Sequence, residues 1–262
     1  MNLSFITWDV SPIAFQFGAT ELRWYGLMFP VAFTLGYFLG RKMFKREGVS
    51  LELVDTLFIL IFISGMLGAR LAHVFFYDWA FFREHPSEIL KTWHGGLASH
   101  GGVVGVMLAL FIWSKATGKT SFLWVMDKVA VCAAPLAGLI RIGNLMNSEI
   151  YGTATNLPWG FIFVFNGETI AKHPTQIYEA ICYFIVFGIL YFQFFKRKAY
   201  LREGFLSGLF AVMVFSARFL IEFIKNDQSA FEAGMRLNMG QWLSVPLILY
   251  GVWLVRRSRK AD

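Results

Sequence analysis

The stretch Arg141-Ile-Gly-Asn-Leu-Met-Asn-Ser-Glu-Ile-Tyr151-Gly152 decides how this sequence is interpreted. It follows an apolar run, residues 129–140, that has the composition of a membrane span. Charged and amide side chains at the end of such a run are costly in hydrocarbon, and they persist there when they pair, face water or hold a ligand. With helical spacing, Arg141, Asn144 and Ser148 share one face, so the cost is concentrated. The pattern leaves two interpretations open, a ligand site and a polar patch that bridges two helices.

Composition places the chain among integral membrane proteins. The 262 residues are 56% hydrophobic and only 16% charged, whereas soluble domains carry about 25% charged residues. The net charge of +7 then reflects loops that face the anionic inner leaflet, and it does not indicate binding to nucleic acid. Cys132 and Cys182 lie within apolar runs, and their spacing suggests neither a disulfide nor a metal site.

The hydrophobic runs predict an all-α, polytopic membrane protein with about seven transmembrane helices in one domain, residues 1–262. Each run is near the length of about 20 residues that crosses the hydrocarbon. An outer amphipathic segment, residues 1–23, precedes the first run and is expected along a membrane surface. The expected spans are residues 24–40, 54–77, 96–113, 122–145, 176–195, 204–224 and 241–255.

Loop charge predicts the orientation of these spans. The segments that would lie on one side hold 14 Lys and Arg residues, and those on the other side hold 6. Because basic residues stay on the cytoplasmic side, we expect the amino terminus outside and the carboxyl terminus in the cytoplasm.

Polar residues of five spans then fall at one depth, near the outer boundary. A transporter would more often place such groups at the midplane between repeated halves, so we expect a cavity open to the outer leaflet. The residues at this depth are Arg70, His73, His100, Arg141, Asn144, Asn147, Glu149, His173, Gln176, Tyr178, Glu179, Arg218 and Glu222.

The residue types in this set suggest transfer chemistry on a lipid. Arg70, Arg141 and Arg218 have few carboxylates to neutralise them, and arginine binds phosphate with two parallel hydrogen bonds. A phospholipid headgroup supplies the nearest phosphate at that depth. His100 lies between two glycine pairs, and histidine is suited to accept a proton at neutral pH.

Six sequence blocks in a fixed order give the chain a resemblance to the prolipoprotein diacylglyceryl transferase family. The similarity covers essentially the whole chain, with the Arg141 block resembling the family signature. The blocks are Arg23-Trp-Tyr-Gly-Leu-Met28, Gly95-Gly-Leu-Ala-Ser-His100-Gly-Gly, Arg141-Ile-Gly-Asn-Leu-Met-Asn-Ser-Glu149 with Gly152, His173-Pro-Thr-Gln-Ile-Tyr-Glu179, Ala217-Arg-Phe-Leu-Ile-Glu222 and Met239-Gly-Gln-Trp-Leu-Ser-Val-Pro246.

The resemblance implies an enzyme of the bacterial inner membrane, with its active site facing the outer leaflet. It implies transfer of the diacylglyceryl group of phosphatidylglycerol to the lipobox cysteine thiol of a preprolipoprotein, with release of glycerol phosphate. Membrane lipids and preprolipoprotein signal peptides are then its partners, and neither metal nor cofactor is needed.

Fitting the residues to this reaction makes His100 the base, with Arg141 and Arg218 holding the departing phosphate. Residues that bind and orient the substrate are expected to be Tyr25, Arg70, Asn144, Glu149, Gly152 and Glu222.

Several alternatives stay open at this point. His100 can instead cap or bridge helices, Arg218 and Glu222 can form a plain ion pair on one helix face, and Glu179 can pair with an arginine. A non-catalytic lipid- or peptide-binding protein and a small-solute transporter remain the rival classes. The segment Lys225-Asn-Asp-Gln departs from the arginine and Pro-Asp that the family tends to show there, which weakens the case for a third phosphate contact.

Overall fold

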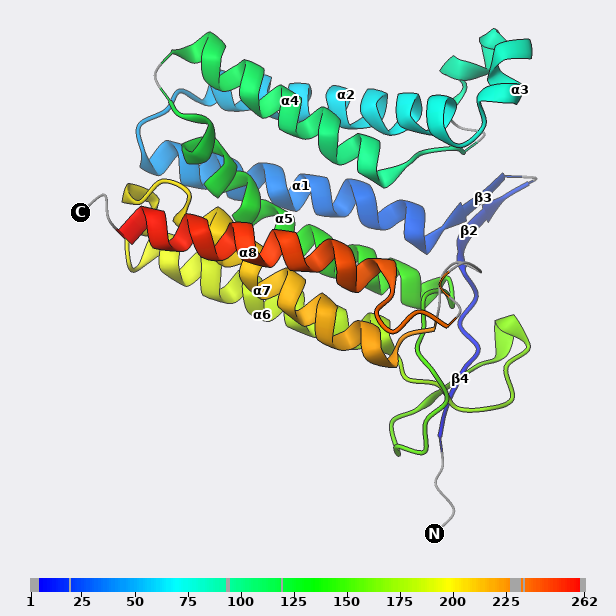
Figure 1. The fold of residues 1–262 in the computed structure, drawn as a ribbon. Helices are drawn as coiled ribbons and strands as arrows, with labels where there is room; N and C mark the ends of the chain where they lie inside the picture. The colour runs from blue at the N-terminus through cyan, green and yellow to red at the C-terminus, as the bar shows by residue number, and fades with distance from the viewer. Residues whose placement is uncertain are drawn as a thin grey trace. The chain divides into compact units, whose positions relative to one another are not determined.

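The computed structural model describes residues 5–18, 20–92, 95–118, 120–226, 232 and 234–259. Most of these residues form helices (Figure 1). Within the described ranges, five helices are long and apolar enough to cross a membrane, as expected for a polytopic protein. They are α2 (Leu51–Phe76), α4 (Ser99–Thr117), α5 (Phe122–Met146), α6 (Thr175–Phe195) and α7 (Phe205–Ile221, continued by the 3-10 turn η5, Glu222–Ile224).

The two remaining expected spans also form long helices. These are α1 (Trp24–Arg46) and α8 (Met239–Arg259), each with a proline inside it. Both extend past the predicted cytoplasmic ends of their spans into basic residues such as Arg41 and Arg256. The remaining short helical segments are α3 (Trp79–Glu84), η1 (Pro86–Leu90), η3 (Val164–Asn166) and η4 (Ala199–Leu201).

In the part of the chain that the structure describes, four short strands depart from the all-α expectation. β2 (Ile13–Phe17) and β3 (Thr20–Arg23) form an antiparallel hairpin, and β1 (Ile6–Trp8) pairs in parallel with β4 (Phe161–Phe163). Apolar residues alternate with small or polar ones in β2, which is the period of a strand and not of a helix. The Trp8 indole also donates to the Leu145 carbonyl over 3.1 Å. Residues 5–18 and 20–23 therefore contribute three strands, two of which form a hairpin.

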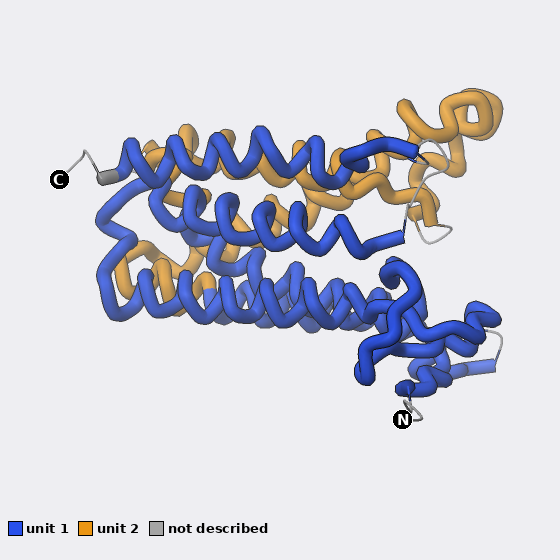
Figure 2. Tube along the Cα trace, turned by 60° about the horizontal axis from the view of Figure 1, so that its bottom comes forward, with its two compact units in different colours: residues 1–39, 127–262 blue, residues 40–126 orange. Residues whose placement is uncertain are grey.

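The chain contains two compact units, residues 1–39 with 127–262, and residues 40–126 (Figure 2). Close backbone contact at glycines joins helices within each unit. In the smaller unit, a Cβ on Gly101 of α4 would lie 2.2 Å from the Gly68 carbonyl oxygen of α2. In the larger unit, a Cβ on Gly208 of α7 would lie 2.8 Å from the Gly251 carbonyl oxygen of α8. Small residues at such crossings let membrane helices approach closely. The single-domain interpretation stays a prediction.

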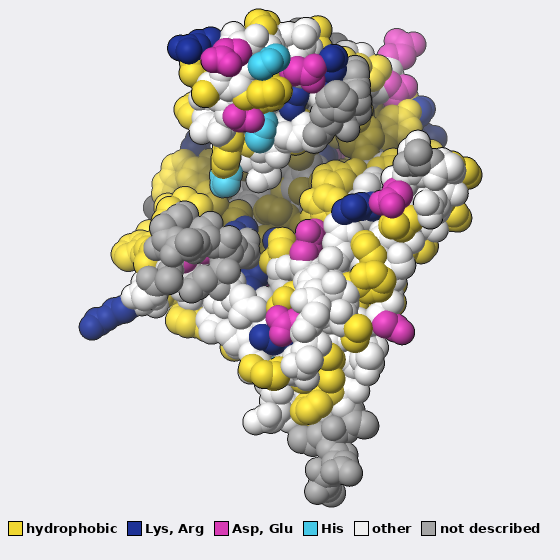
Figure 3. Space-filling model, turned by 90° about the vertical axis from the view of Figure 1, so that its right-hand side faces the viewer, with side chains coloured by type: hydrophobic (Ala, Val, Ile, Leu, Met, Phe, Trp, Pro, Cys, Tyr) yellow, Lys and Arg dark blue, Asp and Glu magenta, His cyan; other side chains and the backbone are white. Residues whose placement is uncertain are grey.

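The apolar helices leave much of their surface uncovered by the protein itself. Only 17% of the most apolar stretch of α2 is buried, against 44% for α5, so α2 needs another apolar environment such as lipid. The view in Figure 3 shows charged side chains of both signs and histidines exposed together with hydrophobic ones, which is typical of segments that meet water and headgroups.

Candidate active site

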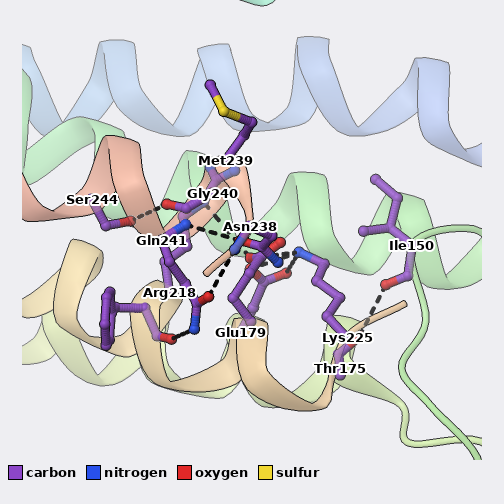
Figure 4. Close-up of polar contacts among 12 residues, drawn as sticks. Ile150, Thr175, Glu179, Arg218, Lys225, Asn238, Met239, Gly240, Gln241 and Ser244 are labelled. Atoms are coloured by element: carbon purple, nitrogen blue, oxygen red, sulfur yellow. Dashed lines mark hydrogen bonds and ion pairs between the residues drawn. The ribbon is translucent and has the colours of Figure 1, made fainter. Parts of the chain in front are cut away.

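Glu179 is the centre of a buried ionic cluster in the larger unit. Its carboxylate, on the first turns of α6, has no exposed surface. Arg141 of α5 donates from Nε to Glu179 Oε2 over 2.9 Å. Lys225, which follows η5, places Nζ 3.3 Å from Glu179 Oε1 (Figure 4). A buried carboxylate is tolerated when cations and hydrogen bonds replace its water. The cations come from α5 and from the segment after η5, so these two segments meet α6 at Glu179.

A second carboxylate, Glu222, extends the cluster towards α7. Lys225 Nζ lies 3.6 Å from Glu222 Oε2, and Arg218 Nε lies 4.0 Å from the same oxygen. The latter distance is too long for a hydrogen bond. Among the described residues, Arg218 Nε and Glu222 Oε2 are buried without a hydrogen-bond partner. The described residues therefore do not saturate the Arg218 guanidinium, and its side chain is 34% exposed, so it can donate to a ligand oxygen from its exposed part.

The third carboxylate, Glu149, reaches Arg141 through an amide. Arg141 Nη1 donates to Asn144 Oδ1 over 3.1 Å, and Asn144 Nδ2 donates to Glu149 Oε1 over 2.7 Å. An asparagine side chain has one end that accepts and one that donates. Glu149 therefore fixes which end of Asn144 faces Arg141, and it orients the guanidinium indirectly.

Glycines bring the surrounding backbone close to this cluster. A Cβ on Gly143 would lie 3.0 Å from Tyr25 Cδ2, so α1 and α5 touch where Tyr25 stands. A Cβ on Gly152 would lie only 2.3 Å from the Ile224 carbonyl oxygen. Gly152 thus lets the chain after Glu149 approach the segment that carries Lys225.

Arg70 belongs to the smaller unit, where its guanidinium is occupied by backbone. It donates to the carbonyls of Glu88 and Gly95 over 2.6 Å, of Ile89 over 2.8 Å and of Gly96 over 3.0 Å, with a longer contact to Lys91. These five backbone carbonyls occupy the guanidinium N–H groups of Arg70, which a phosphate would need as donors. The geometry gives Arg70 a structural role at the base of the loop that leads to α4.

Two histidines of the smaller unit lie near this loop. His73, half-buried, helps to line a cavity of about 230 Å³ together with Arg70, Asp78, Phe81, Phe82, Glu88, Gly95 and Gly96. His100 lies in the first turn of α4 and is exposed. An exposed imidazole at a helix start is accessible to a substrate thiol, and its role as the base stays a prediction.

The structure modifies the expected charge balance. The expectation that the arginines have few neutralising carboxylates is wrong for Arg141, which pairs with Glu179 as the sequence had suggested. The sequence placed Glu179 at the depth of the expected cavity but not among the substrate-binding residues, and Lys225 was not expected at the site. Lys225 directly follows the expected span 204–224, where a lysine is common, so the sequence carried no signal that its side chain turns inward to Glu179.

Comparison with known proteins agrees with these observations. The family model described as prolipoprotein diacylglyceryl transferase matches residues 12–257. The chain belongs to this family. A relative from Chloroherpeton thalassium is 42% identical over 257 residues, covering 98% of this chain and 96% of the relative. One from Tolumonas auensis is 44% identical over 253 residues, covering 97% of each chain.

A third family member, from Porphyromonas gingivalis, is 41% identical over 271 residues, covering 98% of this chain and 96% of its own. All three relatives are named phosphatidylglycerol–prolipoprotein diacylglyceryl transferase. The family resemblance read from the six sequence blocks is confirmed.

Proposed function

We propose that this protein transfers the diacylglyceryl group of phosphatidylglycerol to the lipobox cysteine of preprolipoproteins, the first step of lipoprotein maturation. The relatives' names support the two substrates and the reaction. The observation that carries the proposal for this chain is the cluster of Arg141, Arg218 and Lys225 around the buried carboxylates of Glu179 and Glu222, in which the 34% exposed Arg218 is only loosely paired, 4.0 Å from Glu222.

Arg218 is the cation of the cluster that is best placed to take an anionic ligand. Arg141, Arg218 and Lys225 are in contact with two carboxylates, Glu179 and Glu222. Glu149 is held by asparagine amides and keeps its negative charge, so the three cations and the three carboxylates balance. The Arg218 side chain is 34% exposed and lies 4.0 Å from Glu222 Oε2, so its charge is the least closely compensated of the three cations. A phosphodiester such as phosphatidylglycerol carries one negative charge, which the guanidinium can pair with.

The proposed chemistry is a displacement at carbon. The cysteine S–H gives its proton to His100, because the thiolate is the strong nucleophile. The thiolate forms an S–C bond to the glyceryl carbon that bears the phosphate ester, and that C–O bond breaks. The electron pair leaves with glycerol phosphate, which can take the proton back.

Arg141 and Arg218 would stabilise the negative charge that grows on the departing phosphate. Removing one such preorganised contact typically costs about 3–4 kcal/mol in the transition state. Tyr25, Asn144, Glu149, Gly152 and Glu222 are proposed to bind and orient the substrate. Arg70 is proposed to support the His100 loop in place of the phosphate contact first expected.

The membrane arrangement is part of the proposal. We infer seven crossings, formed by α1, α2 and α4 to α8, with the amino terminus outside and the carboxyl terminus in the cytoplasm. The basic residues on the ends of α1 and α8 support this orientation. The site would then face the outer leaflet of the bacterial inner membrane, where lipobox peptides emerge.

The direct test uses purified full-length protein, phosphatidylglycerol in mixed micelles and a lipobox peptide, with the peptide mass as readout. We expect the mass to rise by one diacylglyceryl group, and not when serine replaces the peptide cysteine. Arg141→Ala should abolish the gain while the protein stays folded. Binding of phosphatidylglycerol without any peptide modification would instead favour a non-catalytic lipid-binding protein, and solute flux in proteoliposomes would favour a transporter.

A further inference from the structure

The turn that follows α5 has an unusual backbone. Ser148 and Ile150 have φ angles of 52° and 61°, the left-handed region, with Glu149 between them. This region is unfavourable for residues with a Cβ by roughly 1–2 kcal/mol each, and a β-branched isoleucine is a marked exception there. Surrounding contacts must hold such a backbone in place.

Three consecutive carbonyls of this turn each accept a hydrogen bond from a side chain. Thr175 Oγ1 donates to the Ile150 carbonyl over 2.9 Å (Figure 4), and Gln176 Nε2 donates to the Glu149 carbonyl over 2.7 Å. Asn166 Nδ2 donates to the Ser148 carbonyl. Thr175 and Gln176 have no exposed surface, so water does not substitute for these donors.

The turn determines where the Glu149 carboxylate points. It folds the chain back so that the Glu149 N–H bonds the Asn144 carbonyl over 3.0 Å, while the Glu149 carboxylate accepts from the Asn144 amide. Asn144 in turn accepts from Arg141. A different turn conformation would move the carboxylate away from the amide and release the orientation of the guanidinium.

We propose that Thr175 and Gln176 are positioning residues that hold the left-handed turn at residues 148–150, and thereby aim Glu149 at the Asn144–Arg141 pair. They act on the phosphate-binding arginine through the backbone and contact no reacting atom. The inference rests on the proposed transfer reaction, because only that reaction gives the orientation of Arg141 a measurable consequence.

This mechanism predicts a specific rescue. Thr175→Val removes the hydroxyl donor while keeping nearly the same side-chain shape. The Ile150 carbonyl then loses its hydrogen bond, and only two of the three carbonyls of the turn remain held by side chains. Glycine adopts a positive φ without a steric penalty. Ile150→Gly should therefore allow the turn to form without the Thr175 hydrogen bond. If Thr175 only filled space, Ile150→Gly would not restore the activity lost in Thr175→Val.

The experiment compares the wild type, Thr175→Val, Ile150→Gly and the double variant in the peptide-mass assay. We expect Thr175→Val to lower kcat at least about tenfold, the loss seen when orienting partners are removed from metal sites, with a smaller change in the KM for peptide. The double variant should recover most of that loss, and Thr175→Ser should keep activity because it keeps the hydroxyl.

The outcomes distinguish a failure of the proposed function from a failure of the positioning role. A wild type that never modifies the peptide overturns the proposed function. An active wild type with an unchanged Thr175→Val variant, or with no recovery in the folded double variant, overturns the positioning role. If Thr175→Val does not fold, recovery of folding and activity by Ile150→Gly supports the role. If the double variant also fails, Thr175→Ala with and without Ile150→Gly decides by the same comparison.

Discussion

Lys225→Met is the sharpest test of the ionic cluster, because methionine nearly matches the lysine stem but carries no charge. The Lys225 side chain is 1% exposed, and its Nζ lies 3.3 Å and 3.4 Å from the two oxygens of Glu179. A third carboxylate oxygen, on Glu222, lies 3.6 Å away. The substitution would leave Glu179 with Arg141 and Glu222 with the distant Arg218.

The magnitude follows from the burial of both partners. Removing one member of a buried ion pair typically costs 3–5 kcal/mol, since the other charge stays buried and uncompensated. Burial lowers the pKa of the Lys225 amine below its ordinary value, and attraction by Glu179 opposes this effect. The wild type therefore already bears the cost of desolvating the amine, and methionine removes that cost. We expect the free energy of unfolding to fall by about 3 kcal/mol, the lower end of the range for buried pairs.

The assay is reversible unfolding in mixed micelles, combined with the KM for phosphatidylglycerol. Lys225→Arg serves as the matched control, because it retains the charge and can donate to both carboxylates. Glu222→Gln in the Lys225→Met background should recover part of the lost stability, since Glu222 is the carboxylate left with only Arg218, 4.0 Å away, and a double-mutant cycle isolates the Lys225–Glu222 pair. The KM for phosphatidylglycerol should rise in Lys225→Met, because the cluster would then hold one more carboxylate than it has cations and would repel an anionic headgroup.

Two results would refute this reasoning. A loss of stability below about 1 kcal/mol, the value of an exposed pair, would mean that the cluster is hydrated and that burial does not set its energy. A large stability loss with an unchanged KM would separate Lys225 from phosphate binding and leave it a purely structural residue.

Three further substitutions test close contacts around the site. Gly240→Ala would place a Cβ 2.8 Å from the Glu222 carboxylate carbon. Because the end of the Glu222 side chain can shift, we expect reduced transfer activity with little change in the unfolding temperature. In Gly152→Ala the new Cβ would lie 2.3 Å from the Ile224 carbonyl oxygen. Because the backbone cannot shift easily, the free energy of unfolding in a denaturation assay should fall by about 1–3 kcal/mol, and unchanged stability would contradict this close packing. Arg70→Lys loses the fork that serves several carbonyls, so amide exchange of residues 88–91 should accelerate, and unchanged exchange would remove its proposed support of the loop.

The sequence by itself determined the membrane class, the helices and their approximate limits. A spanning segment must satisfy its backbone hydrogen bonds internally and present apolar side chains to lipid, so about 20 consecutive residues carry the whole signal. The expected start of the fourth span at residue 122 coincides with that of α5, and the expected start of the fifth at residue 176 is one residue from that of α6. The pattern of apolar residues is local, which is why it can be read without a structure.

Other features of the site were set only by the tertiary structure. Arg70 and Arg141 look alike in sequence, but one donates to five backbone carbonyls and the other to Glu179. Strand β1 pairs with β4, more than 150 residues later in the chain. Lys225 reaches Glu179 of α6 from the segment that follows η5. Ion pairing and strand pairing depend on distance in space between segments that are remote in sequence, so local composition could not predict which partner each charge would find.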